Sequence, residues 1–580
     1  MKYLDQIDAA FKRLGFSPRA GQREAVEQIV TAFLDQKAVN VIISAPTGSG
    51  KSIIGAVTAE AITAITGGRD DAIKSSISLT SSNVLSKQYD ATFKGLGDTG
   101  KYVMLKGAGN YGCSALSTGG GEEESAESCA WYTMIQKSSE FGDILGRHCN
   151  SCEYLQTKQK KNLVRHLTTN YSYFFIDRMY TGKFEERDLL IWDEAHLIND
   201  LFSEHNAIYF SQKRLQTAAQ EIADNVQLTD LEVNKLLTTI AKDCAIKDKI
   251  NEKNYVQYLN GLIKIYRYAK EHGTIAAERA LRAGKHSQYT KLTRFVKKYE
   301  GLVCKIDDLF KYDYEHVFDY KEDECAVVIK PVFVGTMMGA LQASQRNLFM
   351  SATVSGPMLI KTLGLDPEKT VFIKLPSSFP RENKKMIFFD PLSLSYQSLQ
   401  NPATVSALRK NVAKVVKKHI DDGDRGIILA PSFKLQDEIV DELSRAPWFK
   451  TYKLFEQRKG EKLEHVLSAF KSYTGGPAVL ISPAMFEGVD LPGDLSRFQV
   501  LVKAPFPSLG DKRVKWILDH APDLYNAITV QKMVQGAGRS VRSADDFAVT
   551  YCLDQNGQRL FSGPHNIWRD EFDLRYTKIL

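Results

Sequence analysis

Short apolar runs alternate with stretches of helical periodicity along this chain. Residues 39–43 form a mostly apolar run typical of a buried strand, and residues 189–192 form a second one. Apolar residues recur at helical spacing over residues 53–65, shortly after the first run, and over residues 231–246. Buried strands joined by amphipathic helices are typical of α/β folds with parallel sheets, so this fold class is predicted.

Composition narrows the class of protein without identifying it. The chain has 580 residues, which at roughly 150 residues per domain suggests about four domains. A hydrophobic content of 43% excludes a disordered chain. No apolar run reaches the length of a membrane span and charges interrupt the N-terminal apolar positions, so neither a span nor a secretory signal is predicted and a cytoplasmic location is expected. The net charge of +7 favours polyanionic partners only slightly.

The clearest chemical signal follows the first apolar run. It reads Ala45-Pro46-Thr47-Gly48-Ser49-Gly50-Lys51-Ser52 and opens the predicted helix over residues 53–65. A strand, a glycine-rich turn and a helix are the context that a P-loop requires. The glycines let backbone N–H groups point at phosphate oxygens, Lys51 should reach the β and γ phosphates, and Ser52 should ligate Mg²⁺. Ala45 replaces the first glycine of the usual pattern, but a plain glycine turn explains Gly-Lys-Ser poorly, so we predict a nucleotide site.

The second apolar run ends in Asp193-Glu194-Ala195-His196. A carboxylate at the end of a buried parallel strand can lie beside the P-loop, where Asp193 can hold Mg²⁺ and Glu194 can polarise a water molecule. These four residues alone could form an ordinary solvated loop. Together with the upstream P-loop they indicate hydrolysis of a nucleoside triphosphate.

A third candidate segment, Gln535-Gly536-Ala537-Gly538-Arg539-Ser540-Val541-Arg542, lies near the C-terminus. Arg539 and Arg542 are three residues apart, so on a helix they share a face and both could reach a γ-phosphate. Gln535, one turn earlier, could contact the phosphate or the attacking water. The alternative is a surface helix with two solvated arginines.

In chain order, these segments resemble the motifs of superfamily 2 helicases, specifically the iron–sulfur branch that contains XPD and DinG. The resemblance extends to Arg19 and Gln22 on the adenine side, Thr80 and Ser81 in a segment that touches the nucleic-acid backbone, residues 351–353, residues 431–433 and residues 486–493. The last string, Phe-Glu-Gly-Val-Asp-Leu-Pro-Gly, is the most selective for this branch. One departure is Asp554-Gln555-Asn556, where the family often has Asp-x-Arg.

The resemblance completes the predicted sites. It implies that Ser351 and Thr353 couple hydrolysis to movement and that Glu487 and Asp490 lie in the nucleotide cleft. The predicted catalytic residues are Lys51, Asp193, Glu194, Gln535, Arg539 and Arg542. The predicted ATP-binding residues are Arg19, Gln22, Pro46, Thr47, Gly48, Ser49, Gly50, Lys51, Ser52, Glu487 and Asp490.

Four of the eight cysteines cluster, as Cys113, Cys129, Cys149 and Cys152. The closing Cys-x-x-Cys presents two thiolates to one metal centre, and the two distant cysteines complete a four-thiolate shell. Spacing alone does not separate an iron–sulfur cluster from structural zinc, and chance clustering of buried thiols is a third alternative. The position and flanks resemble the 4Fe–4S insertion of XPD and DinG, although Glu153 stands where that family often has Pro. Nearby candidates for stacking on bases are Tyr111, Trp131, Tyr132 and Tyr154.

A basic stretch lies between the second and third candidate segments. Residues 253–298 hold eleven Lys or Arg against two Glu, a local charge of +9, with interleaved tyrosines at 255, 258, 266 and 268. This mixture suits contacts to single-stranded nucleic acid, and Lys297 and Lys298 are predicted to bind DNA along with Thr80 and Ser81. The alternative, a solvated helical face with tyrosines turned inward, is about equally consistent with the sequence.

The resemblance implies two RecA-like parallel-sheet motor domains with an iron–sulfur insertion and a helical Arch insertion in the first. The expected parts are motor domain 1 at residues 1–105, 157–200 and 329–356, the cluster insertion at 106–156, the Arch-like insertion at 201–328 and motor domain 2 at 357–580. The implied function is ATP-dependent translocation on single-stranded DNA, 5′→3′, coupled to duplex unwinding. The alternatives are a helicase for RNA–DNA hybrids, or an ATP-switched remodelling or binding protein that does not unwind. The expected cofactors are ATP, Mg²⁺ and a 4Fe–4S cluster, and the expected partners are single-stranded or forked DNA and a single-strand-binding protein, with the chain acting as a monomer.

Overall fold

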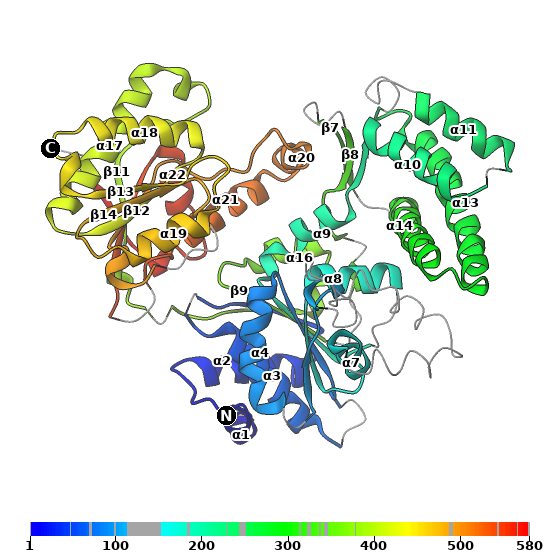
Figure 1. The fold of residues 1–580 in the computed structure, drawn as a ribbon. Coiled ribbons are helices and arrows are strands. Elements are labelled where there is room, and N and C mark those ends of the chain that lie inside the picture. The colour runs from blue at the N-terminus through cyan, green and yellow to red at the C-terminus, as the bar shows by residue number, and fades with distance from the viewer. Residues whose placement is uncertain are drawn as a thin grey trace.

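The computed structural model places two large parallel sheets and one small antiparallel sheet in the chain (Figure 1). It describes residues 2–577 except for 47, 69–71, 98–99, 113–151, 182–185, 228, 243–250, 312–314, 322–325, 336–337, 342–345, 378, 487–490, 542–544 and 565. The predicted α/β class with two RecA-like motor domains is confirmed by the two parallel sheets. Within the described residues, no helix is both long enough and apolar enough to cross a membrane.

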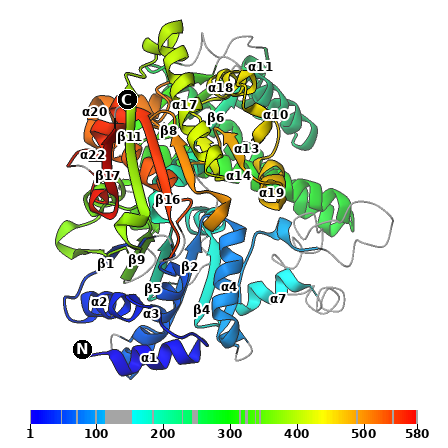
Figure 2. The same cartoon turned by 90° about the vertical axis from the view of Figure 1, so that its left-hand side faces the viewer.

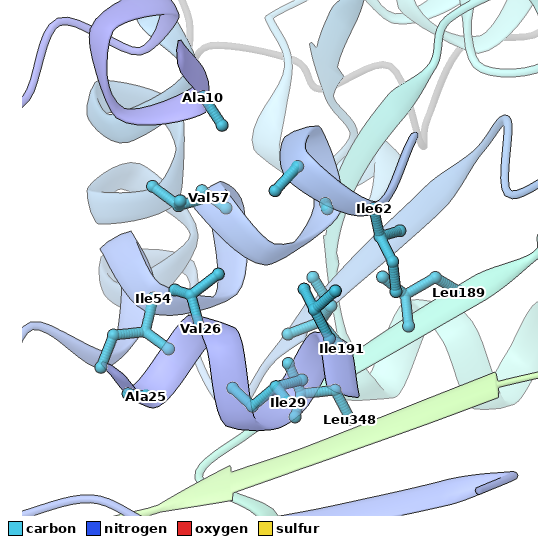
Figure 3. Packing of buried hydrophobic residues seen from close by; sticks show 14 of the residues in the cluster. Ala10, Ala25, Val26, Ile29, Ile54, Val57, Ile62, Leu189, Ile191 and Leu348 are labelled. Carbon is cyan, nitrogen blue, oxygen red and sulfur yellow. The ribbon is translucent and has the colours of Figure 1, made fainter. Parts of the chain in front are cut away.

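The first sheet has seven parallel strands, in the order β10 (Thr370–Lys374), β1 (Asn40–Ser44), β9 (Arg346–Ser351), β5 (Leu189–Asp193), β2 (Ser76–Thr80), β4 (His166–Asn170) and β3 (Tyr102–Met104). One core cluster joins it to α1 (Leu4–Arg13), α2 (Gln22–Leu34), α3 (Lys51–Thr66) and α4 (Asn83–Gly97). Figure 3 shows part of this core, where Val26, Ile29 and Ile54 pack near Ile191 and Leu348. A second cluster joins the sheet to α7 (Glu153–Lys160), α8 (Tyr171–Ile176), α9 (Ile198–Asn206), α15 (Met338–Leu341) and α16 (Gly356–Leu363). β1 and β5 are buried at every position, which explains why they appear in the sequence as apolar runs, whereas the buried β2 and β4 contain several polar residues.

The second sheet is also parallel, in the order β13 (Lys453–Glu456), β14 (Ala478–Ser482), β12 (Arg425–Leu429), β15 (Phe498–Leu501), β16 (Ala548–Asp554), β11 (Lys384–Leu392) and β17 (Asp573–Thr577). One core cluster holds α17 (Pro402–Asp421) and α18 (Phe433–Arg445) against it. A separate cluster holds α19 (Leu463–Ser472), α21 (Pro522–Ala537) and α22 (Gln555–Ser562). Seen from the side, β11, β16 and β17 lie above the strands of the first sheet (Figure 2).

A third unit projects from the first sheet (Figure 1). Its antiparallel strands are β6 (Ile208–Ser211), β8 (Ala326–Pro331) and β7 (His316–Lys321), and its helices are α10 (Gln212–Asn225), α11 (Leu231–Lys242), α13 (Tyr255–Arg282) and α14 (His286–Lys311). These helices share one apolar core. The unit overlaps the span predicted as a helical insertion, 201–328, except that β8 continues to Pro331, and residues 283–285 join its two long helices.

The chain leaves the first sheet later than predicted. The boundary between motor domains was expected after residue 356, but α16 packs in a core of the first sheet and β10 pairs with β1 from Thr370 to Lys374. The first sheet therefore extends to Lys374. The reason is that β1 would otherwise form an open edge, and the returning segment supplies the hydrogen bonds that this edge lacks.

Candidate nucleotide site between the two sheets

The glycine-rich turn takes the conformation expected of a phosphate-binding loop. It leaves the buried strand β1 and enters α3 at Lys51, and Gly48 and Gly50 have φ angles of 84° and 75°. Glycine adopts this left-handed region without the steric cost that a Cβ brings. The backbone N–H groups at the start of α3 are thereby free of helical partners and can face an anion. Thr47 lies outside the described residues.

Gln22 holds this loop in place from the start of α2. Its side chain is 2% exposed, and its Nε2 donates to the carbonyl of Ser49 at 2.8 Å while its Oε1 accepts from the backbone N–H of Arg19 at 2.9 Å. A Cβ on Gly50 would lie 2.5 Å from Gln22 Nε2, so a side chain there would displace this amide from its hydrogen bond to Ser49. The structure thus brings Gln22 to the loop, while the Arg19 side chain is exposed.

Two carboxylates face the loop from the end of β5. Asp193 is 3% exposed, and Glu194 lies 3.8 Å from the Nζ of Lys51 through its Oε1. Glu194 has a φ of 51°, which is uncommon for a residue with a side chain and marks local strain at this position. Burial, with the adjacent charge of Glu194, raises the pKa of Asp193 to about 7. Burial opposes ionisation of Glu194 as well, but the nearby positive charges of Lys51 and Arg539 contribute to lowering its pKa.

These two acids fit a divalent cation at the Asp193 position. A buried carboxylate with a raised pKa beside a second, ionised carboxylate carries unfavourable negative charge that a cation relieves. Carboxylate and hydroxyl oxygens are the ligands that Mg²⁺ takes, and Asp193 with the Ser52 hydroxyl would hold it there.

His196 connects this site to the second sheet. Its Nε2 lies 3.0 Å from Gln535 Nε2, and its Nδ1 lies 2.7 Å from Ser351 Oγ and 3.4 Å from a Glu194 oxygen. An amide nitrogen is only a donor, so the imidazole Nε2 accepts from Gln535 and Nδ1 carries the proton. That tautomer donates to Ser351 on β9. Gln535 Nε2 also lies 2.9 Å from Thr353 Oγ1, so one side chain of α21 contacts two segments of the first domain.

Other contacts join the two domains around the same cleft. Trp568 Nε1 donates to Ser44 Oγ at 3.1 Å, at the last residue of β1 before the glycine-rich turn. The buried Arg513 of α20 (Lys512–His520) donates to the carbonyl of Val332 at 2.9 Å and to Asp200 at 2.8 Å. Trp568 and Arg513 therefore join the two domains in addition to Gln535.

The structure describes only Arg539 of the two predicted arginines. Arg539 lies close enough to lower the pKa of Glu194, and its Nη2 donates to the carbonyl of Phe486 at 2.5 Å. Glu487, Asp490 and Arg542 lie outside the described residues, so their placement stays a prediction.

Only part of the segment predicted to touch the DNA backbone has side chains that are exposed to a ligand. Thr80 is fully buried, and its hydroxyl bonds Ser86 Oγ at 2.7 Å and the Ser82 carbonyl at 3.1 Å. Its side chain therefore shapes the turn after β2 instead of facing a ligand, whereas Ser81 is half-exposed. Asn83, which belongs to the same predicted segment, bonds both Asn110 and Asn170 at 2.9 Å. These three residues are far apart in sequence, and only the parallel strand ends bring them together.

Most of the basic stretch forms a helical hairpin, and its tyrosines face the core of the third unit. Tyr266 is 4% exposed and the other three tyrosines pack partly buried on the same core. Several of its cations pair with acids on neighbouring helices, as Lys264 with Glu232 and Lys298 with Glu221 do. Lys297 and Lys298 are exposed, which keeps them accessible to a partner.

The cysteine prediction falls almost entirely outside the described residues. Cys113, Cys129 and Cys149 are among residues 113–151, and Cys152 alone is described, half-buried at the start of α7. The two described aromatics near it are not stacking platforms. Tyr111 and Tyr154 are 5% and 4% exposed and pack against each other with ring centroids 5.3 Å apart, because both belong to a core of the first sheet.

Comparison with known proteins agrees with this geometry. Residues 415–560 match a family model described as the helicase C-terminal domain, and residues 15–228 match one described as the type III restriction enzyme res subunit. The chain is 20% identical over 604 residues to the ATP-dependent DNA helicase YoaA of Escherichia coli, an alignment that covers 93% of this chain and 92% of that protein. It is 24% identical over 253 residues to the ATP-dependent DNA helicase DinG of Photobacterium profundum, an alignment that covers 40% of this chain and 35% of that protein.

Solved structures show the same architecture. A structure titled as an XPD helicase superposes with a TM-score of 0.58 at 14% identity and covers 97% of this chain and 100% of its own. The S. tokodaii Xpd4 structure gives a TM-score of 0.54 at 14% identity, with coverages of 96% and 100%. Two matched family models, relatives aligned over nearly the whole chain and a shared fold together support one assignment, an ATP-hydrolysing superfamily 2 helicase of the XPD/DinG, or Rad3-related, type.

Proposed function

We propose that this protein is an ATP-dependent DNA helicase that moves 5′→3′ along single-stranded DNA and unwinds duplexes by coupling that movement to hydrolysis. The observation that carries the proposal is the contact of Gln535, on the second domain, with His196 and Thr353 beside the carboxylates of the first. A hydrolytic site that is completed by a second domain can convert each turnover into relative domain movement.

The hydrolytic step follows from the groups around Lys51. The loop backbone and Lys51 bind the phosphates, and Glu194, kept ionised by the neighbouring positive groups, orients and polarises the attacking water. Mg²⁺, when held by Asp193 and Ser52, supplies charge neutralisation at the β and γ phosphates. Arg539, with Arg542, would stabilise charge that develops on the γ-phosphate.

The coupling step uses the hydrogen bonds of His196. The Nδ1–H group of His196 donates a hydrogen bond to Ser351, and its Nε2 accepts one from Gln535. The ring therefore connects β9, the Glu194 segment and α21 through hydrogen bonds. Loss of the γ-phosphate removes the charge that draws Arg539 towards the cleft, so the Gln535 contact becomes easier to break. Reopening of the cleft would then advance the strand.

For the DNA path we propose Ser81 and its neighbours at the carboxyl end of β2, with Lys297 and Lys298 as further contacts on the third unit. The half-exposed Ser81 and the bonded asparagines beside it offer neutral donors of the kind that bind phosphate backbones without reading sequence.

For the cysteine insertion we propose a 4Fe–4S cluster held by Cys113, Cys129, Cys149 and Cys152. Its support is the spacing of the thiols and their position between the β2 and β5 segments of this family. Purified protein should be brown, with absorption near ~400 nm and about four irons per chain. Colourless protein with one stoichiometric zinc would instead support the zinc alternative.

One assay tests the proposed function directly. Forked duplexes with only a 5′ tail or only a 3′ tail are incubated with protein, ATP and Mg²⁺, and strand separation is measured. Separation of the 5′-tailed DNA supports the proposal. Separation of the 3′-tailed substrate alone would show that the protein moves in the opposite direction, 3′→5′. Preference for an RNA–DNA hybrid, or ATP hydrolysis without any separation, would favour the two alternative functions.

A further inference from the structure

Four cationic side chains lie just before four adjacent strands of the first sheet, at the edge opposite the nucleotide site. The sheet order places β5, β2, β4 and β3 side by side. One residue or two before these strands stand, respectively, Arg187, Lys74, Arg165 and Lys101. Because parallel strands begin at the same edge, residues from four separate parts of the sequence come together there, and all four line one cavity of about 350 Å³.

The backbone that carries these cations is held by the sheet. The N–H of Ser76 donates to the carbonyl of Arg165, and that of His166 donates to the carbonyl of Lys101, both at 2.9 Å. The ladder thus continues one residue beyond the strands. Neighbouring strands lie about 4.8 Å apart, so the four charges are spread over a width that a few consecutive phosphate groups can span.

Arg187 fixes the opposite wall of the cavity. Its side chain is 4% exposed and donates through Nη1 to the carbonyl of Val164 at 2.7 Å and through Nη2 to the carbonyl of Lys161. These bonds tie the turn at residues 161–165 to the start of β5. The wall is therefore preformed, which lowers the ordering cost of binding a ligand.

The cavity carries an excess of positive charge. Its described lining residues hold four cations against one acid, Glu186, although Arg165 also lies 3.5 Å from an oxygen of the buried Glu60. The nearby carboxylate of Asp188 already accepts from the backbone of Lys74 and from Ser75. Among the described residues, no carboxylate lies within ion-pair distance of the Lys74 or Lys101 ammonium groups. Like charges around one cavity repel, and an anion with several charged oxygens would relieve the repulsion.

The lining also indicates which part of a ligand is recognised. The described residues of the lining include no aromatic side chain, so none of them offers a surface on which a base could stack. Lysine and arginine donors instead suit phosphate oxygens.

We propose that this cavity binds consecutive phosphate groups, those of a free polyphosphorylated molecule or of a nucleic-acid backbone. It is distinct from the nucleotide site, because five-residue strands place the two edges of the sheet about 16 Å apart. The proposal does not rest on the proposed helicase function. The turn at residues 161–165 joins α7 to β4, so a bound polyanion would also restrain the segment through which the cysteine insertion returns to the sheet.

The test is a calorimetric titration of inorganic tripolyphosphate at low salt. Lys51→Ala provides the background, because it removes the main cation of the nucleotide site. One binding site should remain in that background, and adding Lys74→Ala and Lys101→Ala should weaken it at least about tenfold, because two charge-assisted contacts are lost. Arg187 is left intact, since it supports the wall.

The matched control adds Lys410→Ala and Lys414→Ala, two lysines of α17, to the same background. Unchanged binding in the control supports a specific cavity, and equal weakening in both would overturn the proposal in favour of general surface charge. No binding in the Lys51→Ala background, or no effect of the Lys74 and Lys101 changes, would also overturn it.

A ten-nucleotide oligothymidylate, titrated in parallel, identifies the source of the phosphate groups. Loss of its affinity in the same variant indicates the backbone of a nucleic-acid strand, and an effect on tripolyphosphate alone indicates a free ligand. Hydrolysis by the wild-type protein, lost in Lys51→Ala, tests the nucleotide site separately.

Discussion

Replacing Gln535 with Leu removes the two hydrogen bonds by which α21 contacts the first domain while keeping the size of the side chain. The bonds to His196 Nε2 and Thr353 Oγ1 are 3.0 Å and 2.9 Å long and are both neutral. A neutral hydrogen bond contributes about 1 kcal/mol net, so the variant should lose about 2 kcal/mol of stabilisation of the closed, hydrolytic arrangement. At 1.36 kcal/mol per tenfold in rate, DNA-stimulated kcat should fall about 30-fold.

Nucleotide affinity should hardly change, because Lys51 and the glycine-rich turn are untouched. The assay therefore pairs single-turnover hydrolysis with equilibrium binding of a fluorescent ATP analogue. Gln220→Leu is the matched control, since Gln220 also donates through Nε2, to Asp224 on the exposed surface of the third unit.

A double-mutant cycle with His196→Ala isolates the pairwise contact. If His196 and Gln535 act through their shared bond, the loss in the double variant should be smaller than the sum of the single losses by about 1 kcal/mol. Additive losses, or a kcat within threefold of the wild type in Gln535→Leu, would show that the contact does not couple the domains.

Three further outcomes follow from the structure. Lys51→Ala should abolish ATP hydrolysis and leave single-strand binding nearly intact, measured by phosphate release and fluorescence anisotropy; surviving hydrolysis would contradict the assigned role of the loop. Reversing Lys297 and Lys298 to Glu should weaken DNA binding and reduce the slope of log affinity against log salt by about 1.4 for two lost single-strand phosphate contacts, and an unchanged slope would favour a purely solvated face. Burial opposes ionisation of Glu60, but hydrogen bonds with His166 and Arg13 lower its pKa to about 2 from 4.5, so its ionised form stabilises the fold above about pH 4.5 by about 3 kcal/mol and this contribution is lost as pH falls towards 2. The difference in Tm between wild type and Glu60→Gln should therefore narrow with acidification, and a difference independent of pH would contradict this account.

Local spacing was sufficient to predict the parts of the site that act through neighbouring atoms. The glycine-rich turn needs only a strand before it and a helix after it, and both follow from apolar periodicity within a few residues. Asp193 and Glu194 follow a buried strand in the same way. The fold class could be predicted for the same reason, because buried parallel strands are apolar at nearly every position.

Other features could not be predicted from periodicity because they depend on which segments the sheets bring together. The tyrosines of residues 255–268 fit a nucleic-acid surface and a buried core equally well in sequence, and packing on the core that β6, β7 and α14 share turned them inward. Thr80 matched a motif that contacts the nucleic-acid backbone, but its hydroxyl is hydrogen-bonded within the turn that follows β2. The return of β10 to β1 was missed because its pairing partner lies 330 residues away.

The sequence by itself determined the chemistry of this protein: a phosphate-binding turn, two carboxylates at a strand end and a distant Gln-x-x-x-Arg segment. Tertiary structure alone decided that Gln535 meets His196, which is 339 residues away, and that four scattered cations share one cavity at the opposite edge of the same sheet. The physical reason is that covalent neighbours set local conformation, whereas the strand order of a parallel sheet sets which ends meet. That order is fixed by burial and hydrogen bonding of the whole sheet and has no local signature in the chain.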